Sequence, residues 1–248
     1  MAKQQLEFSA QVLNAAGALG FAPDERAPVD WGRLGAFVTN PVSHRRRLPA
    51  ENAAQIDYPG GTLLHSGLPN PGIKAALRRH ARAWGQSALP VIPHLLADDA
   101  DSLRGMVEQL EEAENILAVE IGVRDDIEES AFRAMVSAAL GELPLIAQCP
   151  LGRAFALGAI AVEAGANCVS LAAPRGTLPD GSGALVEGRL YGPAVFPLGL
   201  GAVRDLAAQG VPVIGGGGVY EMEQVEQMLA AGALAVQVDL AFWRGMSL

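Results

Sequence analysis

One alternation runs through almost the whole chain and limits its fold more than any other feature. A short apolar run is followed by a Gly, Pro or polar turn, and then by an amphipathic stretch of about 10–15 residues. This order repeats from one end of the chain to the other. It is typical of βαβ units, in which helices connect neighbouring parallel strands. The sequence therefore predicts an α/β fold built on a parallel sheet.

The apolar runs and amphipathic stretches can be placed along the chain. The apolar runs predict strands at residues 11–14, 35–39, 90–94, 116–121, 145–148, 168–171, 211–214 and 235–238. The amphipathic stretches predict helices at residues 72–84, 100–112, 128–140, 153–164, 198–209 and 222–231. Eight strands at this spacing fit a closed (β/α)8 TIM barrel better than a doubly wound sheet, and 248 residues is a common size for one such domain. The connection at 41–72 is long, and barrels keep their binding sites in loops that follow strands.

Charge and hydropathy exclude several classes of partner. The net charge is −9 and the sequence pI is 4.9, whereas binding to nucleic acid needs a basic surface. No apolar run approaches the roughly 18 residues of a membrane-spanning helix, and the first residues lack a signal-peptide pattern. We therefore expect a cytoplasmic protein with a small-molecule partner, not a nucleic acid or a membrane.

Cysteine and histidine usage does not indicate a metal centre. Cys149 and Cys168 each lie in an apolar run, which favours buried, reduced thiols over a disulfide. The four histidines, at positions 44, 65, 80 and 94, show no ligand spacing. The basic run at 44–47 has two interpretations, a solvated loop or a rim that attracts anions to a pocket.

The glycines at 215–218 form the strongest local motif for binding chemistry. They follow an apolar run and precede a predicted helix. Exposed amides in such a turn, together with the positive end of a helix, can hold a phosphate. Barrels often hold phosphate between the loops after strands seven and eight, where this motif falls. The alternative is a tight turn that needs glycine for packing alone. Two weaker motifs, at 15–20 and 188–193, are ordinary turns when considered in isolation.

Taken together, six segments resemble the dihydroorotate dehydrogenase family in their order and residues. They are 15–17 (Ala-Ala-Gly), 34–39 (Leu-Gly-Ala-Phe-Val-Thr), 65–72 (His-Ser-Gly-Leu-Pro-Asn-Pro-Gly), 188–193 (Gly-Arg-Leu-Tyr-Gly-Pro), 214–219 and 231–238. In that family the barrel holds FMN at its C-terminal mouth, and hydride passes from dihydroorotate to the flavin. The resemblance implies that the amides around Gly192, Gly217 and Gly218 hold the FMN phosphate, with Ala16 and Gly17 beside the flavin ring. It also implies a homodimer as one possible assembly.

The chain departs from the family pattern at most of the reactive positions. Asn40, which follows Thr39, and Gln148 stand where the family has lysines that contact the flavin. Leu64 and Ala173 replace substrate-binding asparagines, and Asp239 replaces a glycine at the phosphate turn. A carboxylate about 4 Å from a phosphate would cost about 4 kcal/mol at an effective dielectric of about 20, which weakens FMN binding.

The catalytic base of the family is also missing. After the fourth strand only Glu120 matches, and residues 121–126 contain no Cys or Ser. Loss of such a base removes about 10²–10⁴-fold of rate, so dihydroorotate oxidation by the family mechanism is not expected. His65, His94, Glu120 and Arg124 fall at predicted strand ends and are the remaining catalytic candidates, although each also has a purely structural interpretation.

Two hypotheses for function follow. The first is an FMN-type oxidoreductase with altered or weakened activity on a small substrate. The second is a barrel without redox function that binds a phosphorylated or acidic metabolite, or serves as a pseudoenzyme or regulatory subunit.

Overall fold

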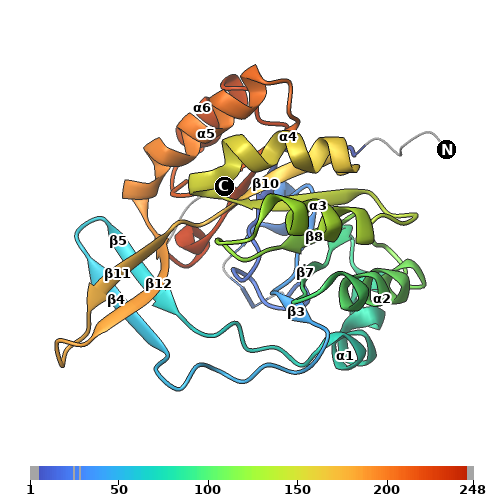
Figure 1. Ribbon diagram of the computed structural model, residues 1–248. Helices are drawn as coiled ribbons and strands as arrows, with labels where there is room; N and C mark the ends of the chain where they lie inside the picture. The colour runs from blue at the N-terminus through green and yellow to red at the C-terminus, as the bar shows by residue number, and fades with distance from the viewer. Residues whose placement is uncertain (1–5, 25, 28, 245–248) are drawn as a thin grey trace.

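The computed structural model describes residues 6–24, 26, 27 and 29–244. Its centre is a ring of parallel strands at all eight predicted positions (Figure 1). The strands are β1 (Val12–Asn14), β2 (Phe37–Val38), β6 (Val91–Ile92) with β7 (His94–Leu96), β8 (Val119–Gly122), β9 (Leu145–Pro150), β10 (Cys168–Ala172), β13 (Val213–Gly216) and β14 (Ala235–Val238). The short strand β3 (Val42–Ser43) pairs with β7.

Pairing between the first and last strands closes this ring. Strand β1 pairs in parallel with β14 and contacts the next strand through a bridge between Leu13 and Ala36. The Asn14 side chain strengthens that contact, because its amide nitrogen donates to Val38 O at 2.6 Å and its oxygen accepts from Val38 N at 2.9 Å. Strand β2 pairs with β6, and β7 pairs with β8. The predicted (β/α)8 barrel is therefore confirmed.

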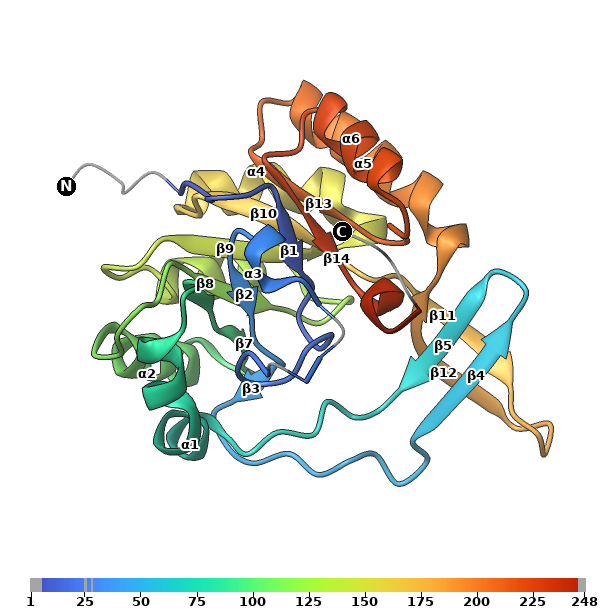
Figure 2. The same cartoon turned by 180° about the vertical axis from the view of Figure 1, so that it is seen from behind.

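Helices cover the outside of the barrel at the six predicted positions (Figure 2). They are α1 (Ile73–Gln86), α2 (Ala100–Glu111), α3 (Glu129–Ala138), α4 (Ala154–Ala164), α5 (Phe196–Ala208) and α6 (Met222–Ala230). Short 3-10 helices are η1 (Trp31–Arg33), η2 (Leu151–Arg153), η3 (Pro193–Val195) and η4 (Leu240–Arg244). In the described residues, η1 follows β1 and η4 follows β14 where a regular barrel would have α-helices. None of the helices formed by this part of the chain is long and apolar enough to cross a membrane.

Two apolar layers hold the barrel together. The inner layer fills the ring with side chains that include Leu13, Ile92, Ile146 and Ile214, all fully buried. The outer layer packs the strands against the helices. Burial of one such aliphatic side chain contributes about 1.5–3 kcal/mol, so these two layers fix the strands rigidly and hold their C-terminal ends in place.

A second sheet, which the sequence analysis did not predict, projects from the C-terminal end of the barrel. Strands β4 (Ala54–Tyr58) and β5 (Gly61–His65) form one hairpin, and β11 (Arg175–Pro179) and β12 (Leu185–Tyr191) form another. The two hairpins join through antiparallel pairing of β5 with β12 (Figure 2).

This sheet corrects two interpretations of the sequence. The connection at 41–72 is not only a loop, and residues 188–191 are not a turn but the end of strand β12. Each hairpin is marginal alone, because a two-stranded ribbon buries little apolar surface. Pairing of segments more than a hundred residues apart stabilises both.

Candidate active site

A cavity of about 690 Å³ opens at the C-terminal mouth of the barrel. Its floor is formed by residues at the ends of the barrel strands, and the antiparallel sheet supplies one wall. Residues from β7, β8, β9, β13 and β14 contact it, together with His65 on β5 and Tyr191 on β12. This is where (β/α)8 barrels carry their active sites.

A buried polar network lies in the floor of the cavity, centred on Glu120. One carboxylate oxygen of Glu120 lies 2.6 Å from His94 Nδ1. The other accepts from Ser170 Oγ at 2.6 Å and from Gln237 Nε2 at 2.8 Å. Burial would raise the pKa of Glu120, but the bonds from His94, Ser170 and Gln237 outweigh it and the pKa is lowered. Glu120 is therefore ionised at neutral pH although no part of it reaches solvent.

This network fixes the orientation of His94. Because Glu120 is ionised and only accepts, the Nδ1 of His94 must be the donor, so Nε2 is the ring nitrogen that Glu120 does not contact. That nitrogen faces Gly122: a side-chain carbon placed on Gly122 would lie 2.6 Å from His94 Nε2. Both His94 and Gly122 line the cavity. Only 3% of the His94 side chain is exposed, so the missing side chain at Gly122 makes room for the imidazole itself at the edge of the cavity.

A second buried carboxylate, Asp239, lies in the same cavity directly after β14. Its side chain is only 6% exposed, and its Oδ1 has no hydrogen-bond partner among the described residues. Burial raises its pKa to about 6, and the nearby amides of Leu240, Gly218 and Ala241 lower it in part. The pKa of Tyr191 is raised to about 12, mainly by burial and to a smaller extent by the charge of Asp239. Asp239 is therefore a buried acceptor that the protein itself does not satisfy.

The glycine corners next to Asp239 are mostly closed by backbone. A side-chain carbon on Gly218 would lie 2.5 Å from Phe196 N and 2.6 Å from Gly192 O. The same carbon on Gly192 would overlap the backbone of Gly60 and Gly61. Gly217 lines the cavity, whereas Gly192 and Gly218 are not part of its lining. The amide of Gly218 lies near the Asp239 carboxylate.

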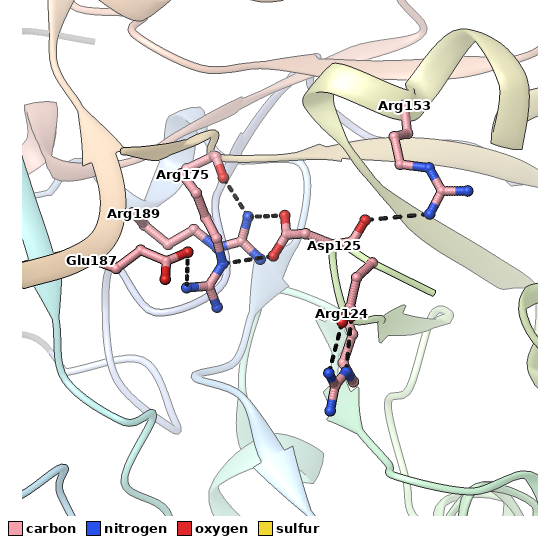
Figure 3. A network of polar contacts seen from close by, with 8 residues as sticks. Arg124, Asp125, Arg153, Arg175, Glu187 and Arg189 are labelled. Atoms are coloured by element: carbon pink, nitrogen blue, oxygen red, sulfur yellow. Dashed lines mark hydrogen bonds and ion pairs between the residues drawn. The ribbon is translucent and has the colours of Figure 1, made fainter. Parts of the chain in front are cut away.

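An ionic cluster ties the antiparallel sheet to the loop after β8. Figure 3 shows Arg175 of β11 and Arg189 of β12 pointing toward Asp125, whose carboxylate oxygens lie 2.8 and 2.7 Å from their guanidinium nitrogens. Arg175 also lies 3.5 Å from Glu187. From the opposite side, Arg153 donates to the backbone oxygen of Asp125 at 3.3 Å. These charges compensate one another and hold the wall of the cavity.

Among the residues predicted from sequence, the structure brings one group together around the cavity. These residues are Ala16, His65, His94, Arg124, Gln148 and Gly217. Glu120 lies directly beneath them, bonded to His94. The Arg124 side chain is well exposed at the rim and pairs with Asp126 at 2.8 Å. The Nε2 of His65 lies 3.2 Å from Asn52 Oδ1.

Other predicted residues lie outside the lining and have structural partners. Thr39 Oγ1 accepts from the amide of His94 at 3.1 Å and is fully buried. The Asn40 side chain accepts from the amide of Gly20 at 3.0 Å, which ties the loop after β1 to the end of β2. Gly17 is exposed outside the cavity lining, and Gly192 and Gly218 lie in the closed corner.

The remaining polar candidates have simple roles. Cys149 and Cys168 are free and buried, and burial raises the pKa of Cys149 to about 12, so both thiols remain protonated. No group of three His, Cys, Asp or Glu in the described part of the chain has the geometry to hold a metal ion. The exposed basic run at 44–47 lines a hollow of about 460 Å³ that adjoins the mouth cavity, since Arg47, Leu96 and Asp98 line both.

Several residues at the site were missed from sequence, and one simple signal points to some of them. Side chains alternate between the two faces of a strand, so Ser170 shares the inward face with Cys168, and Gln237 shares it with Ala235 and with Asp239, which the sequence had already singled out. A polar residue on that inward face, one step above the apolar layer, faces the mouth. Arg175 and Arg189 gave no such signal, because their place depends on the unpredicted sheet.

Comparisons with known proteins agree with the architecture. No family model matches the chain. The catalytic subunit of dihydroorotate dehydrogenase B (NAD(+)) from Thermodesulfovibrio yellowstonii is 28% identical, covering 95% of this chain and 85% of the relative. Dihydroorotate dehydrogenase A (fumarate) from Lacticaseibacillus paracasei is also 28% identical, covering 93% of this chain and 87% of the relative.

A solved structure extends the agreement to the fold. The crystal structure of DHODH in complex with ferulenol from Eimeria tenella superimposes with a TM-score of 0.72 at 15% identity, covering 95% of this chain and 77% of the other. The six sequence segments and the similarity over most of the chain agree: the chain resembles the dihydroorotate dehydrogenases at 28% identity and shares their barrel fold.

Proposed function

We propose that this protein binds a small polar metabolite in the mouth cavity and that His94 exchanges a proton with it, without oxidising dihydroorotate. The main observation is the buried Glu120–His94 pair at the cavity, with Nδ1 and Oε2 2.6 Å apart and Nε2 beside Gly122. It shares the absence of redox chemistry with the second hypothesis above, but it adds an acid–base group and does not require a phosphorylated or acidic ligand.

The pair supplies the elements of general acid–base chemistry. His94 would exchange the proton at Nε2, and ionised Glu120 would stabilise the imidazolium form of the ring. Ser170 and Gln237 hold Glu120 in place, so the ring does not need to reorient during the transfer. A positioned base of this kind contributes about 10²–10⁴-fold to the rate of a proton transfer.

The surroundings do not favour family-type hydride chemistry. Lysines near a flavin would stabilise the negative charge that develops there, but the described lining of the cavity contains no lysine. Gln148 faces the cavity as a neutral amide, and Asn40 is engaged with Gly20. Dihydroorotate oxidation would therefore lack its electrostatic support.

The phosphate corner also does not fit FMN. The amide of Gly218 lies near the Asp239 carboxylate, and backbone closes the space around Gly192 and Gly218. A phosphate in this corner would face a buried negative charge, and the approximate cost of 4 kcal/mol at 4 Å applies even at an effective dielectric of about 20. The proposed proton exchange at His94 therefore does not involve a flavin.

An FMN-type oxidoreductase with weakened activity is the second candidate. It is favoured by the small residues Ala15, Ala16, Gly216 and Gly217 along one side of the cavity, which leave room for a flat ring, and by the relatives described above. The two candidates differ in one simple observable. Purified protein with flavin absorbance, or protein that takes up added FMN and oxidises dihydroorotate, would favour the second candidate over the first.

Solvent deuterium exchange tests the first candidate without knowledge of the product. The protein is incubated in D₂O with dihydroorotate and a set of small carbonyl compounds, and proton NMR follows exchange at the carbon next to the carbonyl. We expect exchange of at least one compound with the native protein and a loss of at least 100-fold in His94→Gln, in line with the contribution of a positioned base. The exposed His44 provides the control His44→Gln, which should exchange normally. Equal exchange in His94→Gln, or none in the native protein, would refute the proposal.

A further inference from the structure

The corner formed by Asp239 contains an unsatisfied acceptor in a cavity whose other charges are largely paired. Asp239 Oδ1 is buried and has no partner among the described residues. At the rim, Arg124 is paired with Asp126, and Arg175 and Arg189 are paired with Asp125. Buried polar atoms in proteins almost always have a hydrogen-bond partner, so an unpaired one that lines a cavity calls for a donor from the ligand.

The groups around Asp239 do not provide that donor. Hydrogen bonds from the amides of Leu240, Gly218 and Ala241 offset only part of the effect of burial on the pKa of Asp239. Tyr191 interacts with Asp239 through charge, but no bond between the two side chains satisfies Oδ1. The side chain of Gln237 donates to Glu120 instead.

The chemistry of the corner is thus the reverse of a phosphate cradle. A glycine-rich turn with free amides attracts an anion. Here a carboxylate that belongs to the chain already lies near the Gly218 amide, and Asp239 is one of the residues that line the cavity. What this corner can accept is a group that carries hydrogens and positive charge, because such a group both donates to Oδ1 and compensates the buried charge.

We propose that Asp239 binds a protonated amine of the ligand, so that the cavity selects small amine-bearing molecules and rejects phosphate-bearing ones. This inference rests on the proposed function only in using the same cavity. It adds the substrate class: a small molecule with an ammonium group for Asp239 and an exchangeable proton for His94.

Three probes with one ring and different head groups test the choice of ligand. Benzylammonium, benzyl alcohol and benzoate are titrated into the full-length protein at pH 8, where Asp239 is charged, and affinities are measured by ligand-observed NMR. We expect benzylammonium to bind at least tenfold more tightly than benzoate, with benzyl alcohol between them. In Asp239→Asn, which keeps the size of the side chain and removes its charge, this preference should fall below threefold. Asp98→Asn is the matched control, because Asp98 also lines the cavity but is exposed, and it should retain the preference.

Asp239→Gly tests the exclusion of phosphate. This variant should bind FMN at least tenfold more tightly than the native protein, measured by quenching of flavin fluorescence. The proposal is overturned if benzylammonium does not bind the native protein, if benzoate binds as tightly, if Asp239→Asn keeps the preference, or if native protein and Asp239→Gly bind FMN equally. His94→Gln should keep the head-group preference, so a negative result in deuterium exchange and a negative result here are separate outcomes.

Discussion

Two buried carboxylates at one end of the barrel have opposite environments. Glu120 accepts hydrogen bonds from Ser170 and Gln237 and is paired with His94, and these partners lower its pKa despite complete burial. Asp239 has an unpartnered oxygen, and burial raises its pKa to about 6. Burial is similar at the two positions, so the difference lies in the donors.

This contrast separates a structural charge from a charge available to a ligand. The energy of desolvating Glu120 is offset within the protein, and the group then positions His94. The energy of desolvating Asp239 is only partly offset, because Oδ1 has no donor among the described residues, and a ligand that donates to Oδ1 would offset more of it. Unsatisfied buried groups are retained where function requires them, which is why we place ligand binding at Asp239 and not at Glu120.

The largest expected effect comes from removal of the satisfied charge. Glu120→Ala should lower the free energy of unfolding at pH 7 by about 3–5 kcal/mol, because it leaves three buried polar partners without their acceptor. Urea denaturation followed by circular dichroism measures this. A loss below about 1 kcal/mol would show that the network around Glu120 is not the strong element that its geometry indicates.

Replacement of the unsatisfied charge at Asp239 should raise the free energy of unfolding, whereas Glu120→Ala lowers it. The pKa of Asp239 is about 6 in the folded protein, above the ordinary aspartate value of 3.8, so the folded state holds the proton more tightly. The contribution of Asp239 to the free energy of unfolding is therefore fully present below about pH 4, where the carboxyl group is protonated, and is lost as pH rises through 6. A difference of about two pKa units corresponds to about 3 kcal/mol. Asp239→Asn should therefore stabilise the protein by up to about 3 kcal/mol at pH 8 and by little at pH 4.

Urea denaturation at both pH values checks this prediction, with Asp98→Asn as the control. Because Asp98 is exposed, its replacement should change stability by less than about 0.5 kcal/mol at either pH. Destabilisation by Asp239→Asn at pH 8 would mean that the carboxylate has a partner and that the contrast with Glu120 is wrong.

A smaller effect is expected when one donor is removed from Glu120. Ser170→Ala should cost about 2 kcal/mol at pH 7, within the usual range for a hydrogen bond to a charged group. It should also raise the pH at which acid unfolding begins, since the pKa of Glu120 is held down partly by this bond. Acid titration monitored by tryptophan fluorescence gives both quantities, and an unchanged acid midpoint would contradict this role for Ser170.

The smallest effect is expected at the rim, where solvent screens the charges. Asp125→Asn should cost about 1 kcal/mol or less, because Arg175 and Arg189 remain partly exposed. The loss should diminish further in 1 M NaCl. A salt-independent loss above about 2 kcal/mol would show that Asp125 behaves like the buried Glu120 and not like a surface pair.

Part of the candidate site could be predicted from sequence because strand ends in a barrel are predictable. His94 was chosen as a residue at the end of a predicted strand, and Glu120 and Gln148 were chosen also through the family resemblance; the structure brings all three to one cavity floor and its lining. The choice of Thr39 and Asn40 followed the family resemblance, and the partners that engage them, His94 and Gly20, depend on loop packing. No local sequence pattern predicts hydrogen bonds of this kind, because the two partners are distant in sequence.

The sequence by itself determined the barrel, because the alternation of apolar runs and amphipathic stretches is a local property that sets strands, helices and their order. Only the tertiary structure decided two matters. It joined the β4–β5 and β11–β12 hairpins into one sheet, and it turned Asp239 into the cavity, near the Gly218 amide. Both depend on contacts between residues distant in the chain, where pairing and desolvation are set by neighbours in space and not by neighbours in sequence.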